Sequence, residues 1–207
     1  MPLTVRAKVV DIRTDTPIST DRFLVDTNAW YWLFYPRASQ VLSTPRSYQL
    51  TDYPSYIEKA INSKSSLHCC ALNFSELAHN IEKVEREIYA DKSNLTINTK
   101  DFRHNYVGQR GKILDLINEI WSDVESMSVF LDMNLDITFM ESALSLFPSV
   151  SLDGYDLFMA EMALKTGVTK VITDDGDYAT VPGLTIFTSN SKIIAEAAKQ
   201  RNKLITR

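Results

Sequence analysis

Short apolar runs that alternate with helical segments constrain the fold of this 207-residue chain more than any other feature. The runs occupy 23–25, 66–72, 128–131, 170–173 and 184–188. Patterns typical of helices occupy 28–34, 56–62, 74–89, 106–125, 137–147, 154–165 and 191–200. Gly167 follows one of these helices at the position where glycine commonly ends a helix. The alternation predicts an α/β fold, a three-layer α/β/α sandwich with a central parallel sheet.

The length fits one domain with a substantial core, and we expect that domain to span 22–207. Residues 1–21 are polar and rich in Thr and Asp, so we expect an irregular N-terminal arm there. Two segments read as helical or loop insertions, at about 35–65 and 91–125. Within them, 37–54 and 91–101 are predicted to be loop and linker, because Ser, Thr, Pro and other polar residues dominate.

Acidic residues stand where the predicted strands pass into the helices that follow them. They are Asp26, Glu76, Asp156 and the group Asp174, Asp175 and Asp177. The carboxyl ends of parallel strands meet at one edge of a sheet, and functional groups gather there. The sequence therefore predicts that these acids converge.

Several carboxylates in one cleft repel one another and need a positive partner. A site rich in oxygen ligands suits Mg²⁺ or Mn²⁺. Such an ion can orient a phosphodiester, activate water and stabilise the leaving oxygen. The chemistry predicted from the acids is thus metal-dependent hydrolysis of a phosphodiester.

Each acid also has a purely structural interpretation. Asn73-x-x-Glu76 fits a capping box, and Asp153-x-x-Asp156 is an acidic variant of it. Asp26 could cap a helix, and the Asp- and Gly-rich segment at 174–177 could be only a turn. Capping alone explains one such acid better than it explains four at successive strand-to-helix transitions.

Three motifs together resemble those of PIN-domain ribonucleases, a family that includes VapC-type toxins of bacterial toxin–antitoxin pairs. They are FLVDTN ending at Asn28, NFSEL around Glu76, and DLFMA from Asp156 followed by VITDDGDY ending at Tyr178. The resemblance implies a parallel sheet flanked by helices, and an acidic pocket that binds Mg²⁺ or Mn²⁺ and cleaves single-stranded or structured RNA. Partners that it implies are RNA and an antitoxin protein, and the aromatic run at 30–35 is predicted either to pack in the core or to contact an antitoxin or a second copy of the chain.

By the same resemblance, Asp26, Glu76 and Asp156 match the three core acids and the metal ligands. Asp175 and Asp177 both match later acidic positions, whereas Asp174 occupies a variable one. Thr27 or Asn28 matches a polar position supporting the first acid, and Thr173 begins the T-x-D-x-D-[FY] run within the last motif.

The prediction from the sequence is a metal-dependent endoribonuclease. The segments before Asp26, at 35–65 and at 91–125, depart from compact toxins and leave open whether it is a toxin or another PIN nuclease. One alternative is a catalytically degenerate PIN fold that binds RNA or protein. Another is a phosphohydrolase using Asp26 as covalent nucleophile, although Asn28 stands where such enzymes commonly have a second Asp.

Basic and aromatic residues gather at 100–112, and we predict that Arg103, Arg110 and Lys112 flank the acidic pocket and bind RNA phosphates. The alternative is a solvated linker that leads into a helix. The formal net charge of −4 excludes a uniformly basic surface but leaves room for such a local patch.

The remaining features point to an ordinary reducing, cytoplasmic location. Cys69 and Cys70 are adjacent and read as buried reduced thiols. His68 reads as a packed core residue, and His79 has no second Glu-x-x-His pair that would suggest a metal role. No signal peptide, membrane span or phosphate-binding glycine loop is evident.

Overall fold

The computed structural model describes residues 3–40, 46–132 and 134–207. Within these ranges, six strands form one sheet in the order β1-β6-β5-β2-β3-β4, and every neighbouring pair is parallel. The strands are β1 (Lys8–Asp11), β2 (Arg22–Val25), β3 (Ser66–Cys69), β4 (Val129–Phe130), β5 (Lys170–Ile172) and β6 (Thr185–Thr188).

Helices cover both faces of the sheet. One face carries α1 (Thr27–Phe34), α2 (Ser47–Asn62), α3 (Ala71–Lys92) and α5 (Val107–Met127), and the other carries α6 (Ile137–Leu146), α7 (Gly154–Thr166) and α8 (Ser191–Lys199). Side chains of β2 alternate between the two faces, as a pleated strand requires: Phe23 and Val25 belong to the first core and Leu24 to the second. The predicted three-layer α/β architecture with a parallel sheet is therefore confirmed.

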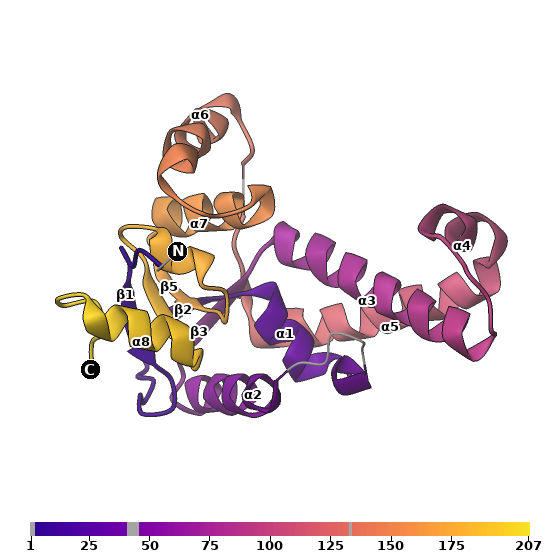
Figure 1. Ribbon diagram of the computed structural model, residues 1–207, viewed down its shortest axis with the longest axis horizontal. Helices are drawn as coiled ribbons and strands as arrows, with labels where there is room; N and C mark the ends of the chain where they lie inside the picture. Colours follow the sequence, from indigo (N-terminus) through magenta and orange to yellow (C-terminus); the bar gives the residue numbers. More distant parts are fainter. Residues whose placement is uncertain (1–2, 41–45, 133) are drawn as a thin grey trace.

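Two projections extend from the sheet (Figure 1). The first is a long arm in which α3 packs on α5 and carries α4 (Thr99–Asn105) near its far end. The second consists of α6 packed on α7. Short 3-10 helices complete the elements: η1 (Ala38–Gln40), η2 (Phe147–Ser149) and η3 (Asp177–Thr180).

The order of the strands creates a crevice beside β2. From β2 the chain moves to β3 on one side, whereas β5 pairs with β2 on the other side. In parallel sheets, the crevice outside the carboxyl ends of the strands at such a switch point is the usual place for a ligand. Asp26 directly follows β2 and therefore lies at this crevice.

The prediction of an irregular arm over 1–21 is wrong for Lys8–Asp11, which forms β1 at the edge of the sheet. Val9 and Val10 are both buried, one on each face, so this short strand carries an apolar pair between two polar ends. Its partner β6 is distant in sequence, and no local sequence pattern predicts that pairing.

The predicted loop at 37–54 is also wrong in part, because α2 begins at Ser47 and carries Pro54 inside it. That proline drew the prediction toward loop, because an internal proline removes a backbone hydrogen bond of the helix. The burial of Tyr53, Tyr56 and Ile57 on α2 outweighs this cost. The part of the predicted loop at 41–45 lies outside the described residues. Similarly, α4 begins at Thr99 within the predicted linker at 91–101, and Tyr106 separates it from α5.

Three smaller expectations concern buried or apolar groups. Cys69 and Cys70 are buried free thiols, as predicted. His68 is buried, and its ring Nδ1 lies 3.2 Å from the carbonyl oxygen of Phe23, which confirms its place in the core. Over the described residues, no helix combines the length and apolar character that crossing a bilayer requires.

Candidate active site

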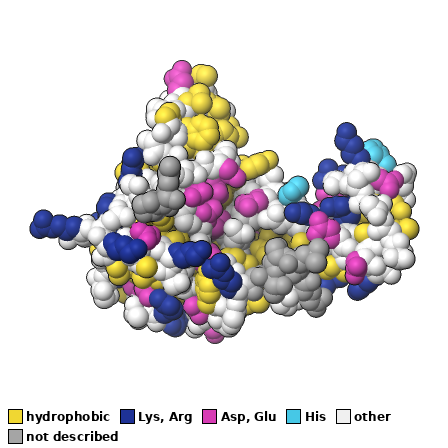
Figure 2. Space-filling model, viewed as in Figure 1, with side chains coloured by type: hydrophobic (Ala, Val, Ile, Leu, Met, Phe, Trp, Pro, Cys, Tyr) yellow, Lys and Arg dark blue, Asp and Glu magenta, His cyan; other side chains and the backbone are white. Residues whose placement is uncertain are grey.

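Four carboxylates meet at the crevice beside β2, and we refer to Asp26, Glu76, Asp156 and Asp175 as the acidic cluster. They come from the end of β2, from α3, from α7 and from the loop after β5. Glu76, Asp156 and Asp175 each raise the pKa of Asp26 by charge repulsion, which places all four within electrostatic reach of one another. Figure 2 shows acidic side chains gathered at the base of the angle between the two projections.

Asp26 is the most deeply buried member, with 2% of its surface exposed. It occupies the N-cap position of α1, but its side chain makes no capping hydrogen bond. Instead, the Thr173 hydroxyl donates to Asp26 Oδ2 over 2.7 Å. Burial raises the pKa of Asp26 well above its ordinary value, repulsion adds to the rise, and the bond from Thr173 opposes it. The capping interpretation does not account for this carboxylate.

Glu76 lies in the second turn of α3 rather than the first, because that helix begins at Ala71 with Cys70 as its N-cap. The capping-box interpretation of Glu76 is therefore wrong: Asn73 Oδ1 accepts from the Cys70 amide, and Asn73 Nδ2 donates to Thr27 Oγ1. The pKa of Glu76 is raised by burial, while a hydrogen bond from the Thr27 hydroxyl lowers it. Glu76 Oε2 is buried and has no hydrogen-bond partner among the described residues.

Asp156 stands in the first turn of α7, where the neighbouring Asp153 does the capping by accepting from the amides of Tyr155 and Asp156. The Tyr178 hydroxyl donates to Asp156 Oδ1 over 2.8 Å. Burial and the charges of the other acids raise the pKa of Asp156 to about 7, despite this bond. Capping thus explains Asp153 but leaves the Asp156 side chain directed at the cluster.

The three acids of the loop after β5 point in different directions. Asp174 turns toward α2, where its carboxylate accepts from Tyr48, Gln49 and Tyr53. Asp175 raises the pKa of Asp26, Glu76 and Asp156, and it also accepts from the Asp177 amide in a local turn. The pKa of Asp177 is raised by burial and by Asp175 and Asp153. Among the three, Asp175 is the member closest in electrostatic terms to the other carboxylates.

The predicted supporting residues divide in the same way. Thr173 and Thr27 both contact the cluster, through Asp26 and Glu76 respectively. Asn28 is half-buried in the first turn of α1 and forms no side-chain hydrogen bond with the described residues. Asn73 and Tyr178 were not predicted to have roles. The sequence marked Asn73 only as a possible helix cap and Tyr178 only as part of the last motif. Their contacts join segments that are distant in sequence, so the sequence alone did not reveal them.

The chemistry of the cluster fits a divalent cation, although the side chains would have to turn to share one. Among the described residues, no group of three or more His, Cys, Asp or Glu side chains stands as it is in an arrangement that could hold a metal ion. Two observations favour a fit all the same. The buried Glu76 Oε2 lacks a partner, and the cluster's carboxylates raise one another's pKa values, so a cation would relieve both.

Two of the three predicted basic residues lie beside the cluster. Arg103 and Arg110 line a pocket together with Glu76, and both guanidinium groups contact the buried Glu82 on the same wall. Lys112 is exposed on α5 and does not line this pocket. The prediction grouped the three by sequence, whereas Lys112 lies two residues from Arg110 on α5 and so on a different face of that helix.

No protein-family model matches the chain, and no curated protein matches its sequence. Among solved structures, the chain is similar to one in the crystal structure of VapBC2 from Rickettsia felis bound to a DNA fragment from their promoter. The match has a TM-score of 0.48 and 13% sequence identity, and it covers 80% of this chain and 96% of that chain.

Proposed function

We propose that this protein is a metal-dependent nuclease that hydrolyses phosphodiester bonds of RNA at the acidic cluster. The observation that carries the proposal is the burial of Asp26 among three further carboxylates at the switch point of a parallel sheet. A cluster of buried carboxylates with raised pKa values destabilises a fold, so its presence favours a functional role.

Residues of the chain hold the acids in place. Thr173 fixes one oxygen of Asp26, and Tyr178 fixes one oxygen of Asp156, which leaves the second oxygen of each free of that bond. Asn73 binds the Val25 carbonyl and the Thr27 hydroxyl, and so joins α3 to the end of β2. These supports would keep the remaining carboxylate oxygens at the crevice, where rotation of the side chains would bring them to one ion.

Asp26, Glu76, Asp156 and Asp175 would hold Mg²⁺ or Mn²⁺, and Asp177 would complete the site from its edge. The bound ion would supply charge stabilisation for the phosphate and lower the pKa of an attacking water. Without it, the raised pKa of Asp156 means that the cluster keeps a proton through part of the neutral range.

A cleavage assay tests this proposal. The protein with Mn²⁺ is expected to cleave a fluorescently labelled RNA of mixed structure, and EDTA is expected to stop the reaction. Asp26→Asn should lower the rate by about 10³-fold or more while the variant remains folded, because charge stabilisation of this kind contributes several kcal/mol. Asp123→Asn, which makes the same change at an exposed position on α5, should leave the rate unchanged. Undiminished metal-dependent cleavage by Asp26→Asn would refute the assignment.

One observation favours the second candidate, a binding module without catalysis: the described side chains do not stand ready to hold a metal ion. Calorimetric titration with Mn²⁺ separates the two. A nuclease should bind the ion, and Asp26→Asn should weaken that binding. Absence of both binding and cleavage would favour the module.

A toxin role and an antitoxin partner are a further part of the proposal, supported by the resemblance of the motifs to VapC-type toxins. Induced expression tests it: the wild-type chain should stop bacterial growth, and Asp26→Asn should not. A homodimer stays a prediction, which sedimentation of the purified protein would check.

A further inference from the structure

A groove runs along α3 from the acidic cluster toward the far end of the arm. Its first part has a volume of about 520 Å³, and its walls come from α3, α4, α5 and α7. A second hollow of about 220 Å³ continues it and shares His79, Glu82 and Arg103 with the first. Glu76 belongs both to the acidic cluster and to the wall of the groove, so the two sites are continuous.

Glu82 organises the cationic wall of this groove. Glu82 is 7% exposed, and its carboxylate accepts from Arg103 through Nε and Nη2 and from Arg110 through Nε. Arg103 Nη1 and both terminal nitrogens of Arg110 keep donors that this carboxylate does not use. One carboxylate thus fixes two guanidinium groups, and the trio has a net positive charge.

The separation along α3 suits neighbouring groups of one extended ligand. Glu76 and Glu82 are six residues apart on a helix, which corresponds to about 9 Å along its axis. An anionic group bound by the two arginines would therefore lie roughly one helical turn and a half from the cluster. Lys83 and Arg86 line the continuation of the groove and extend the cationic wall.

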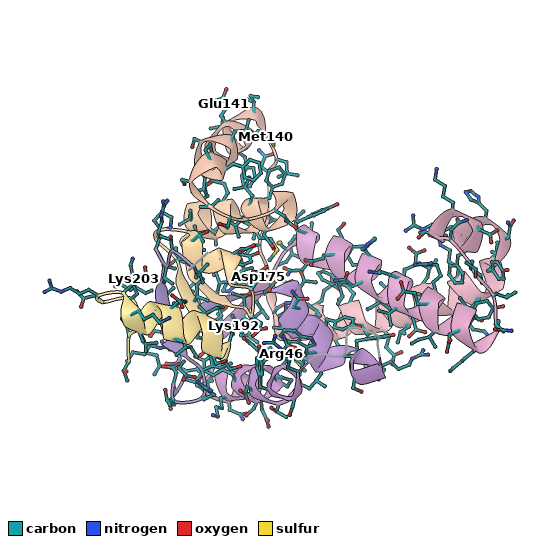
Figure 3. All side chains as sticks on the ribbon, in the orientation of Figure 1. Arg46, Met140, Glu141, Asp175, Lys192 and Lys203 are labelled. Carbon is teal, nitrogen blue, oxygen red and sulfur yellow. The ribbon has the colours of Figure 1, made fainter. Side chains whose placement is uncertain are left out.

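Cationic residues also stand on the opposite side of the cluster. Figure 3 shows Lys192 and Arg46 near Asp175 on the same face. Hydrogen bonds tie their segments to this loop: Gln49 of α2 donates to the Asp174 carboxylate, and Asn190, which caps α8, donates to the Asp174 carbonyl. The acidic cluster is thus bracketed by two positively charged regions, as a polyanion crossing it would require.

Exposed aromatic rings border the groove beside the cluster. Phe74 is 39% exposed and Tyr155 is 57% exposed, and both line the groove. Aromatic rings of this kind stack on unpaired bases, whose faces a duplex hides. Asp26 is buried, and its neighbours Glu76 and Asp156 belong to α3 and α7 of the two projections, so a narrow single strand reaches it more readily than a rigid duplex does.

We infer that the groove between α3 and α5 is a binding subsite for single-stranded RNA, in which Arg103 and Arg110 bind phosphates beside the scissile one. Phe74 and Tyr155 stack on its bases, and the strand leaves across Asp175 toward Lys192 and Arg46. The inference rests on the proposed function for its choice of ligand, but the binding step needs no catalysis.

Binding without cleavage tests the subsite. The probe is a fluorescein-labelled 15-nucleotide single-stranded RNA of mixed sequence, measured by anisotropy in EDTA at several salt concentrations. Arg103→Gln/Arg110→Gln should weaken binding about tenfold or more at low salt, and it should flatten the salt dependence by about 1.4 logarithmic units per decade, the contribution of two phosphate contacts. Lys112→Gln removes a cation from the same arm outside the groove and should change the affinity less than about twofold.

A second variant guards against misfolding. The double variant leaves the buried Glu82 without its cations, so Glu82→Gln/Arg103→Gln/Arg110→Gln removes that charge as well and should show the same loss of RNA binding. If both variants keep the wild-type affinity for the RNA and the wild-type salt slope, the inference is overturned, and a protein partner becomes the favoured occupant of the groove. Equal affinity for a 15-base-pair duplex RNA, with the same dependence on the arginines, would overturn the single-strand assignment.

The outcomes also separate this subsite from the proposed catalysis. If the wild type binds the probe through the arginines but never cleaves RNA with Mn²⁺, the subsite stands and the nuclease proposal fails. If it cleaves RNA but the arginine variants bind normally, the nuclease proposal stands and the subsite fails.

Discussion

Asp156 shows how crowding of like charges affects a single residue. Burial is the largest cause of its raised pKa of about 7, and the charges of Asp175, Asp153 and Glu76 add to it. A carboxyl group whose pKa is higher in the folded than in the unfolded state binds more protons when folded. Stability therefore falls as the pH rises from about 4, where the carboxyl group ionises in the unfolded state, to about 7, where it ionises in the folded state.

We predict that Asp156→Asn stabilises the metal-free protein at pH 8 and has little effect at pH 4. The gain should be on the order of 1–3 kcal/mol, because the amide removes the repulsion but weakens the contact with Tyr178. Thermal unfolding in EDTA at both pH values measures it, with a rise of about 2–4 °C expected for each kcal/mol.

Asp123→Asn serves as the control for charge alone and should shift the midpoint little at either pH. A lower melting temperature for Asp156→Asn at pH 8 would show that the cluster is not under electrostatic strain in the absence of metal.

At the residue scale, the sequence showed which acids to single out but not which residues hydrogen-bond to them. Asp26 and Asp156 could be singled out because they stand at strand-to-helix transitions, a local pattern. The bond from Thr173 to Asp26 joins residues 147 positions apart, and no periodicity encodes it. The pairing of Arg103 and Arg110 with Glu82 was hidden for the same reason, since it depends on how α3 packs against α4 and α5.

At the scale of elements, α2 holds the loop that follows β5. Asp174 accepts from Tyr53 over 2.7 Å, from Gln49 over 2.6 Å and from Tyr48 over 3.1 Å. The Tyr53 hydroxyl also lies 2.9 Å from Thr188 Oγ1 and accepts from the Ser189 amide, so one buried phenol joins α2 to the ends of β5 and β6. The position of Asp175 depends on this contact, because it is the next residue in the loop.

We predict that Tyr53→Phe lowers the free energy of unfolding by about 1–3 kcal/mol, since it leaves buried polar groups without their partner. It should also reduce Mn²⁺-dependent cleavage through the displaced loop. Urea denaturation and the cleavage assay measure the two effects. Tyr48→Phe removes a longer and less buried bond to the same carboxylate, so its effects should be smaller. Equal effects of the two substitutions would contradict a central role for Tyr53.

Elements with strong local periodicity were predictable, and those defined by tertiary contacts were not. The runs that became β2, β5 and β6 are apolar and bounded by helices, so they were evident in the sequence. β1 is a four-residue edge strand with polar ends, and α2 contains a proline. In both elements, packing against distant parts of the chain outweighs weak local preferences.

At the scale of the whole molecule, Arg207 joins the last residues of the chain to the segment before β2. Its guanidinium donates to Asp15 and Asp21, and it lies 4.6 Å from the centre of the Phe187 ring. Asp21 is fully buried and also binds Lys170 and the Ile18 amide. The pKa of Asp21 is lowered to about 2, because these hydrogen bonds and the charge of Arg207 outweigh its burial.

We predict that Arg207→Gln lowers the free energy of unfolding at pH 7 by about 2–4 kcal/mol, since it leaves buried carboxylates short of a cation. A carboxylate with a lowered pKa stabilises the fold above about pH 4, and that contribution is lost as the pH falls toward 2. Acid unfolding of the variant should therefore begin at a higher pH than that of the wild type, as circular dichroism would record. Arg201→Gln, an exposed position nearby in sequence, should change neither measurement. Identical acid unfolding of Arg207→Gln and the wild type would contradict this account.

The parallel pairing of β2 with β5 has a consequence for synthesis of the protein on the ribosome. Asp26 emerges early, but the Thr173 hydroxyl that binds it follows 147 residues later. At a translation rate of ~5–20 residues per second, that interval lasts about 7–30 s. The growing chain therefore carries an incomplete cluster until Thr173 has been added, and the cleavage that we propose would not begin before that point.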